Sequence, residues 1–347
     1  MSKLSRRDFL RVVALGTGAV ALNKFLAACS PGSVNPTSAP ARLLPTATRV
    51  VSTKTPATSA ESTSTQEASS PQTTSVPGAP DLVVVRGGEP EAMVRRALAS
   101  LGGIEKFVPK GANVVVKPNI CVAYHTYEYA ATTNPWVVGT LVKMCFEAGA
   151  GSVKVMDFPF GGTAQEAYVK SGIKDQVEAA GGEMAYMPGF KYVTTMIPNG
   201  VEMKKTDVFD DILKADVLIN VPIAKHHSLA QLTLGMKNLM GVVRNRSALH
   251  ANIGQRLADL STLIRPQLTV LDAVRILMAN GPTGGNLNDV KQLDTILAST
   301  DIVAVDSYAT TFFGMQPDDI PYIKTAAAMG LGRNDLKSLK IEEISGA

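Results

Sequence analysis

From residue 81 onward, short runs of β-branched residues alternate with segments of helical periodicity, and this alternation restricts the fold more than any other feature of the chain. Runs such as 114–116 and 217–219 are apolar at every position, as in parallel strands that are buried on both faces. The segments between such runs have the length and pattern of helices. Strands separated by helices indicate an α/β fold with a mostly parallel, Rossmann-like sheet covered by helices, built as one domain or as two lobes.

The same patterns predict where the individual elements lie. Strands are expected at 82–85, 113–117, 152–157, 217–221, 267–271 and 295–298, with short strands and turns within 184–203. Helices are expected at 91–101, 135–148, 163–170, 171–180, 208–214, 253–263, 302–313 and 318–329. A long polar loop is expected after the strand that ends at residue 221, because that stretch lacks a clear period.

The first 29 residues have the pattern of an export signal that ends in a lipidation site. Arg6 and Arg7 precede a Phe-Leu pair and a further basic residue, as in signals of the twin-arginine export machinery. The apolar run at 12–22 is shorter than the ~20 residues that a membrane-spanning helix needs, which is typical of a signal peptide. Leu-Ala-Ala-Cys at 26–29 resembles a bacterial lipobox. We therefore expect export and a lipid anchor at Cys29, on the outer face of the cytoplasmic membrane.

Residues 30–80 differ in composition from the rest of the chain. Of these 51 residues, 35 are Ser, Thr, Pro or Ala, and none is aromatic. Such a segment cannot bury enough apolar surface to offset the entropy that ordering costs. The sequence thus predicts three parts: a signal at 1–29, a disordered tether at 30–80, and an α/β domain at 81–347.

The formal net charge of +4 does not indicate a nucleic-acid partner. Residues 1–28 contain five Lys or Arg and one Asp, so the whole excess lies in the signal and the mature chain is neutral. A nucleic-acid-binding domain would carry a basic patch or stripe. After lipidation only Cys121 and Cys145 remain, without a C-x-x-C pair. An iron–sulfur cluster is therefore not supported, whereas one disulfide and two buried free thiols both remain open.

Polar residues follow several predicted strands, at the sheet edge where α/β proteins bind their ligands. Lys117 ends the strand at 113–117 and Asn119 follows it, and Asp157 ends the next strand beside a Gly-Gly-Thr helix start. Asp272 follows the strand at 267–271. Lysine and asparagine in such places suit an anionic or carbonyl-bearing ligand, and the two carboxylates can orient it or bind a cation. Turn-stabilising or solvent-exposed roles are the alternative.

The densest polar cluster follows the strand at 217–221. It begins with Lys225-His226-His227 and continues with Lys237, Asn238 and His250. Imidazole acts as a general base or as a metal ligand near neutral pH. From these patterns we assign catalytic roles to His226, His227, Lys237 and Asp157, ligand-binding roles to Lys117, Asn119, Lys225, Asn238 and Asp272, and a candidate metal site to His226, His227 and His250.

Together these motifs resemble the bacterial and archaeal family known as domain of unknown function 362, from about residue 83 to residue 333. The resemblance rests on Val115-Val116-Lys117-Pro118-Asn119, Thr132-Thr133-Asn134-Pro135, Val153-Lys154-Val155-Met156-Asp157, Ala215–Pro222 with Lys225-His226-His227, Leu232–Gly241, Gly281-Pro282-Thr283-Gly284 and Ile296–Asp306. Many members of that family also carry a ferredoxin-type cysteine cluster, which this chain lacks. The order of elements is distantly similar to lactate racemase as well, so a metal or a nucleotide-type cofactor is an open expectation that rests on the fold alone.

Two functions follow from the sequence. In the first, the chain is an extracytoplasmic, cofactor- or metal-dependent enzyme in which the assigned residues converge on one pocket and act on a small anionic or carbonyl-bearing molecule. In the second, the same pocket binds a solute without chemistry, as in a receptor lipoprotein. A scaffold or adhesion role lacks support, because the chain shows no repeat and no large apolar stripe.

Overall fold

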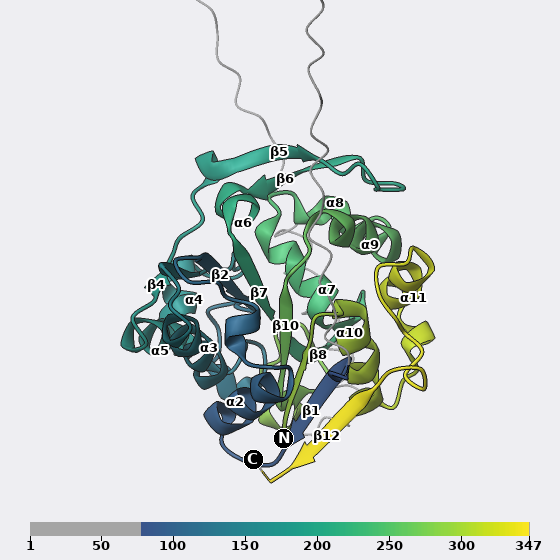
Figure 1. The fold of residues 1–347 in the computed structure, drawn as a ribbon. Helices are drawn as coiled ribbons and strands as arrows, with labels where there is room; N and C mark the ends of the chain where they lie inside the picture. Colours follow the sequence, from purple (N-terminus) through teal and green to yellow (C-terminus); the bar gives the residue numbers. More distant parts are fainter. Residues whose placement is uncertain (1–77, 347) are drawn as a thin grey trace, which may run out of the picture. The chain divides into compact units, whose positions relative to one another are not determined.

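One large mixed sheet organises residues 78–346, the part of the chain that the computed structural model describes (Figure 1). The predicted signal, its Arg6-Arg7 pair, the lipidation site at Cys29 and nearly all of the predicted tether lie outside the described residues. Within 78–346, no helix has both the length and the apolar character needed to cross a bilayer.

The strands of the large sheet follow the order β12-β1-β11-β10-β7-β2-β3-β4, with β8 and β9 attached beside β10. Their bounds are β1 Leu82–Arg86, β2 Asn113–Pro118, β3 Ser152–Val155, β4 Glu183–Met184, β7 Val217–Val221, β8 Ile223–His227, β9 Gln231–Thr233, β10 Leu268–Leu277, β11 Val290–Ser299 and β12 Ile341–Ser345. A separate hairpin consists of β5 Tyr192–Met196 and β6 Lys205–Phe209. The helices are α2 Pro90–Ser100, α3 Pro135–Glu147, α4 Ala164–Lys170, α5 Ile173–Ala179, α6 Asp210–Lys214, α7 Gly235–Asn238, α8 Arg246–His250, α9 Ile253–Leu263, α10 Ile302–Thr310 and α11 Pro321–Ala328.

The strand directions confirm the predicted α/β fold. Along the main path, β2 is parallel to β3 and β7, β7 is parallel to β10, and β12 is parallel to β1. Only β11 runs against its neighbours on that path, β1 and β10. After β2 the chain continues to β3 on one side, and it later returns to place β7 on the other side of β2. Such a reversal of strand order opens a crevice at the carboxyl ends of the strands, where ligands of α/β proteins bind.

Both faces of the sheet are buried, which explains the uninterrupted apolar runs. Successive side chains of a strand point to opposite faces. Val114 and Val116 of β2 therefore pack on the face covered by α2, α3 and α5, while Val115 packs on the face covered by α7, α9, α10 and α11 (Figure 1). Each valine buried in this way stabilises the fold by about 1.5–3 kcal/mol relative to an exposed one.

The predicted elements agree with the structure best where the apolar pattern is strongest. Helix α9 has the predicted bounds, and Asn134 caps α3 by accepting a hydrogen bond from Trp136 N at 3.0 Å. The expected loop after residue 221 is wrong, because it contains the β8–β9 hairpin. The expected helix at 208–214 is also partly wrong, since its first residues complete β6. The segments 205–209 and 223–227 mix charged and apolar residues, so they lack the continuous apolar runs that identify the buried strands.

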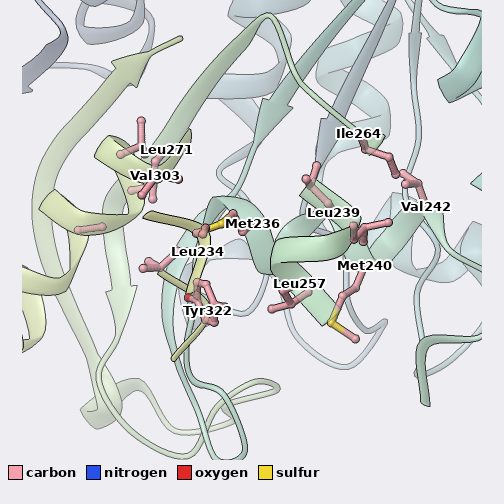
Figure 2. Close-up of a cluster of buried hydrophobic side chains, with 14 of the residues drawn as sticks. Leu234, Met236, Leu239, Met240, Val242, Leu257, Ile264, Leu271, Val303 and Tyr322 are labelled. Carbon is pink, nitrogen blue, oxygen red and sulfur yellow. The ribbon is translucent and has the colours of Figure 1, made fainter. Parts of the chain in front are cut away.

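Two short helical segments, α7 and the following turn at 239–242, are fastened to the core by apolar side chains (Figure 2). Met236, Leu239 and Met240 are buried in the cluster that α9 and α10 also enter. Asp306 of α10 accepts hydrogen bonds from Gly235 N at 2.6 Å and Met236 N at 2.9 Å, and burial raises the pKa of its carboxyl to about 7. Because one face of α7 is held in this way, its other residues have a fixed direction toward the sheet edge.

Candidate functional site

A cavity of about 420 Å³ lies at the carboxyl ends of β2 and β3, next to β8 and α7. This volume is in the range of small-molecule sites. It is lined by Lys117, Asn119, Cys121, Asp157, Phe158, Phe160, Lys225, His227, Leu229, Thr233, Lys237, Asn238, Met240, Gly241, Arg246, His250 and Pro282. Eight of the ten residues to which the sequence assigned chemistry are therefore brought together, and the other two, His226 and Asp272, are not.

A buried ion pair forms the floor of the cavity. Lys117 Nζ lies 2.7 Å from Asp157 Oδ1, and both side chains are almost fully buried. Burial lowers the pKa of the Lys117 amine, and the attraction of Asp157 opposes that effect. Asp157 is held in turn by Ile120 N, which donates to Oδ2 at 2.6 Å, and by Phe158 N, which donates to Oδ1 at 2.9 Å. The carboxylate thus has its charge and its lone pairs satisfied, as a buried ion requires.

Gly241 makes room for this ion pair. A Cβ atom at this position would collide with Asp157 Oδ1 and would lie 2.6 Å from Lys117 Nζ. The glycine therefore serves close approach rather than an unusual backbone angle. The contact with the Lys117–Asp157 ion pair explains why the 232–241 motif ends in a glycine.

An amide network joins the ion pair to the neighbouring strands. Asn238 Oδ1 accepts from Lys117 Nζ at 2.9 Å and from Asn119 Nδ2 at 3.0 Å. Asn238 Nδ2 donates to Lys117 O at 3.1 Å and to Asn220 Oδ1 at 2.9 Å. All four side chains are buried. Asn119 and Asn238 therefore position the lysine, and their hydrogen-bonding groups are largely used within the protein.

Lys225 is a buried cation that contacts no carboxylate. Its Nζ lies within hydrogen-bonding distance of Asn119 Oδ1 at 2.9 Å, Ala131 O at 2.6 Å, Pro282 O at 3.1 Å and Cys121 Sγ at 3.3 Å. These partners occupy the three protons of an ammonium group. Lys225 therefore acts on the cavity through its charge. Cys121 and Cys145 are both free and buried, which settles the alternative left open by their number.

Strand geometry separates the two adjacent histidines. Lys225, His226 and His227 are consecutive in β8, so the first and third side chains point to one face and the second to the other. Lys225 and His227 line the cavity, whereas His226 does not. Instead, His226 Nδ1 accepts from Gly281 N at 3.1 Å. The predicted catalytic role of His226 is therefore not supported by its position.

The hydrogen bonds of His227 determine what its imidazole can do. Leu229 N and Ala230 N both donate to His227 Nδ1, each at 3.1 Å. A neutral imidazole that accepts at Nδ1 carries its proton on Nε2, so it presents a donor there and no free lone pair. Burial, reinforced by Lys237 and Lys225, lowers the pKa of His227 to about 3. At neutral pH this residue is a hydrogen-bond donor, whereas the sequence suggested a base or a metal ligand.

The geometry of the described residues does not support a metal site at the three histidines. His226 points to the other face of β8, and His227 has Nδ1 occupied by two backbone donors, which leaves a proton on Nε2 in place of a lone pair. Within 78–346, no group of three or more His, Cys, Asp or Glu side chains is arranged to hold a metal ion. The structure therefore does not support the predicted metal site at His226, His227 and His250.

Asp272 was expected at a strand end but lies in the middle of β10, which continues to Leu277. Its Oδ2 accepts from Asn134 N at 2.7 Å and its Oδ1 from Val274 N at 2.9 Å. Burial raises the pKa of this carboxyl to about 6. Asp272 thus joins β10 to the start of α3, and the predicted ligand-binding role is replaced by a structural one.

Lys237 differs from the other two lysines of the cavity. Its amine has no hydrogen bond or ion pair with any residue of the described chain, although the side chain is mostly buried. Burial, with the like charges of Lys225, Arg246 and Lys117, lowers the pKa of Lys237 to about 7. A large share of this amine is therefore neutral at physiological pH and carries a free lone pair. Amines in this state act as nucleophiles or as general bases.

Several lining residues were not assigned a role from the sequence. The hydroxyl oxygen of Thr233 is buried and has no hydrogen-bond partner within 78–346. Arg246 donates from Nη1 to Phe158 O at 2.6 Å, and its guanidinium lies 4.8 Å from the centre of the Phe158 ring. Phe158 and Phe160 are exposed by 39% and 54%. In the sequence, two phenylalanines follow closely after the strand-end Asp157, and this pattern could have indicated aromatic side chains at the mouth of a ligand site.

Three known proteins match parts of this chain in sequence or in structure. A thylakoid-associated protein from Synechocystis sp. is 29% identical over 250 residues, which cover 69% of this chain and 75% of that protein. Among solved structures, the lactate racemase apoprotein from Thermoanaerobacterium thermosaccharolyticum matches with a TM-score of 0.43 and 13% identity over 66% of this chain and 56% of that one. A protein from Thermotoga maritima matches with a TM-score of 0.39 and 13% identity over 65% of this chain and 60% of that one. The chain thus spans less than two thirds of either solved structure.

The model of one protein family matches residues 114–311, which include the strands, helices and loops that line the cavity. This match covers more than half of the chain. The protein therefore belongs to the family described as domain of unknown function (DUF362).

Proposed function

We propose that this protein is an exported, lipid-anchored enzyme that binds a small anionic molecule in the cavity beside β2 and acts on it with Lys237. One observation carries the proposal: the cavity is lined by four Lys or Arg side chains and by one carboxylate, Asp157. The charge of that carboxylate is taken by Lys117. Lys225 and Arg246 line the cavity without a counter-ion in the described chain, and a carboxylate or phosphate ligand would supply it.

The proposed chemistry depends on groups that are already in place. Lys237 supplies a neutral amine near pH 7, and His227 supplies a hydrogen-bond donor at Nε2. Lys117 and Lys225 are held by fixed hydrogen bonds, so their charges need no rearrangement when a ligand binds. Preorganised cations of this kind stabilise negative charge that develops on a substrate during reaction.

The anion-binding role predicts a specific loss of affinity. We expect Arg246→Gln to weaken the binding of small carboxylates by about 10- to 100-fold, because a charge-assisted hydrogen bond contributes about 1.5–3 kcal/mol. Glutamine is polar and lacks the charge, and Arg246 lies at the mouth of the cavity, so the fold should tolerate the change. Isothermal titration of the mature protein with a panel of small carboxylates and inorganic phosphate measures the effect.

Arg244→Gln is the matched control, because Arg244 is an exposed residue of the same segment that does not line the cavity. Its affinities should stay within about twofold of the parent, since an exposed charge outside the site contributes little. If no member of the panel binds the parent protein, or if both arginine variants lose affinity equally, the anion site is not where we place it.

The proposed location rests on the sequence of residues 1–29, with Arg6-Arg7 and Cys29 as its determinants. We expect Cys29→Ser to abolish incorporation of labelled palmitate and to release the protein from the membrane fraction. Replacing Arg6 and Arg7 by lysines should leave the precursor inside the cell. Cys145→Ser is the control and should remain lipidated, because Cys145 is a buried residue of the folded part. An unlabelled parent protein with an uncleaved N-terminus would contradict the anchor.

A receptor without catalysis is the second candidate, and the rigid hold on Lys117 and Lys225 favours it as much as it favours an enzyme. The two functions differ in the fate of the ligand. A ligand that is recovered unchanged after long incubation with stoichiometric protein, as followed by NMR, indicates a receptor. A ligand that is converted indicates an enzyme, and Lys237→Gln should then stop the conversion.

A further inference from the structure

We infer that Lys237 forms a covalent imine with the carbonyl carbon of a small 2-oxo acid whose carboxylate is held by the basic side chains of the cavity. This inference deepens the proposed function and rests on it, because the carboxylate must first bind at the cationic site. It assigns a chemical class to the substrate and a bond-forming role to one amine.

The lysine contacts decide which amine reacts. Lys117 is engaged by Asp157 at 2.7 Å, and the Nζ of Lys225 has acceptors in Asn119, Ala131, Pro282 and Cys121. Lys237 has no partner in the described chain and lines the same cavity. Partial burial without a counter-ion disfavours the charged form, so a large share of this amine is in its neutral, nucleophilic form near pH 7.

Unpartnered polar groups around the cavity match the oxygen atoms of the proposed substrate. Thr233 is 3% exposed and its hydroxyl has no partner within 78–346, so it needs a hydrogen bond from outside the described chain. His227 offers its Nε2 proton, because both backbone donors already use Nδ1. A ketone oxygen and the hydroxyl that replaces it during imine formation would satisfy both groups.

The cations of the cavity explain why the carbonyl compound should carry a carboxylate. Lys225, Arg246 and Lys117 line the same cavity as Lys237, so a carboxylate attracted by these groups enters the cavity that holds the Lys237 amine. Arg246 has a second guanidinium nitrogen that makes no hydrogen bond in the described chain, which suits a carboxylate oxygen at the cavity mouth. The carbonyl of a 2-oxo acid is bonded directly to its carboxylate, and this places both groups in one small cavity.

The reaction balances without an oxidant or a metal. The lone pair of the Lys237 amine attacks the carbonyl carbon, the C=O π electrons move to oxygen, and one amine proton is transferred to that oxygen. The resulting carbinolamine then loses its C–O bond as the nitrogen lone pair forms C=N, and the oxygen leaves as water with the second amine proton. One amine and one ketone give one imine and one water, and the imine nitrogen takes up a proton from solvent.

The test is reductive trapping on the mature protein. Pyruvate and phenylpyruvate are each added with sodium cyanoborohydride, which delivers hydride to the C=N carbon and fixes the adduct as a secondary amine. Peptide mass mapping should place an added mass, equal to the oxo acid minus one oxygen, on Lys237. The exposed Lys204 and Lys291 serve as internal controls and should be labelled far more slowly. The rate should rise with pH with a midpoint near 7, the pKa of Lys237, and level off once the amine has lost its proton.

Two further arms separate this inference from the function on which it rests. Lactate has the carboxylate without the ketone, so it should bind, should give no adduct and should compete with pyruvate for labelling. Lys237→Arg leaves the cavity cationic but has no nucleophilic amine, so it should bind pyruvate and lose the adduct. Binding of pyruvate and lactate without labelling of Lys237, or labelling no faster than that of Lys204, overturns the imine and leaves the anion site intact. Absence of binding by every acid overturns the proposed function itself.

Discussion

Replacing Asp157 by alanine is expected to lower the free energy of unfolding by about 4 kcal/mol, which is the largest loss that we predict for this protein. The alanine removes the counter-ion of Lys117, whose amine lies 2.7 Å away and is fully buried. It also leaves Ile120 N and Phe158 N without their acceptor. Urea denaturation followed by circular dichroism measures the effect, and anion binding should be lost together with stability because the cavity floor collapses.

Two comparisons make the Asp157 prediction specific. Glu178→Ala breaks the exposed ion pair with Lys174 and should cost less than about 0.5 kcal/mol. Lys117→Met combined with Asp157→Leu should recover most of the loss, because a buried ion pair can be exchanged for apolar side chains of similar volume. A loss below about 1 kcal/mol for Asp157→Ala alone would show that the pair is hydrated and that the cavity floor is not built as described.

The sheet could be predicted from the sequence because its signal is local. The apolar run in β2 is buried on both faces, and Lys117 near the end of β2 and Asp157 just after β3 lie at the carboxyl ends of their strands, as the pattern indicated. Strand-end positions in neighbouring parallel strands converge whatever the intervening chain does. Lys117, Asn119 and Asp157 therefore lie at one edge of the sheet and line one cavity.

The remaining site residues could not be placed from the sequence, since their directions depend on register. His226 and His227 are adjacent and chemically equal, and only the pairing of β8 with β9 decides which one faces the cavity. Asp272 was predicted to end a strand at 267–271, but β10 continues past it to Leu277 in its pairing with β11. The lack of a partner at Lys237 is a property of distant residues, and no local pattern reports it.

Lys237→Met is expected to stabilise the fold by about 3 kcal/mol near pH 6 while it abolishes imine trapping. Burial and the neighbouring cations lower the pKa of this amine from 10.5 to about 7. Below pH 7 the folded protein must hold a charged amine that the unfolded chain exposes to water, so protonation favours unfolding. Methionine has a similar length and fills the same space without a charge, so the penalty disappears.

The sign and the pH window of this effect follow from linkage. Above pH 10.5 the amine of Lys237 is neutral in the folded and in the unfolded chain, so it does not destabilise the fold. As the pH falls from 10.5 to about 7 the unfolded chain takes up the proton first, and below about 7 the full destabilisation is present. The advantage of Lys237→Met should therefore be largest below about pH 7 and decline steadily toward pH 10.5, as measured by urea denaturation at several pH values.

Lys225→Met is the matched control and should destabilise the protein, because it leaves buried acceptors in Asn119, Ala131 and Pro282 without a hydrogen-bond donor. A protein that becomes more stable when it loses a lysine, and at the same time loses its reaction, holds that lysine for chemistry rather than for folding. Destabilisation by Lys237→Met at pH 6 would instead make Lys237 a structural residue and remove the basis for the imine.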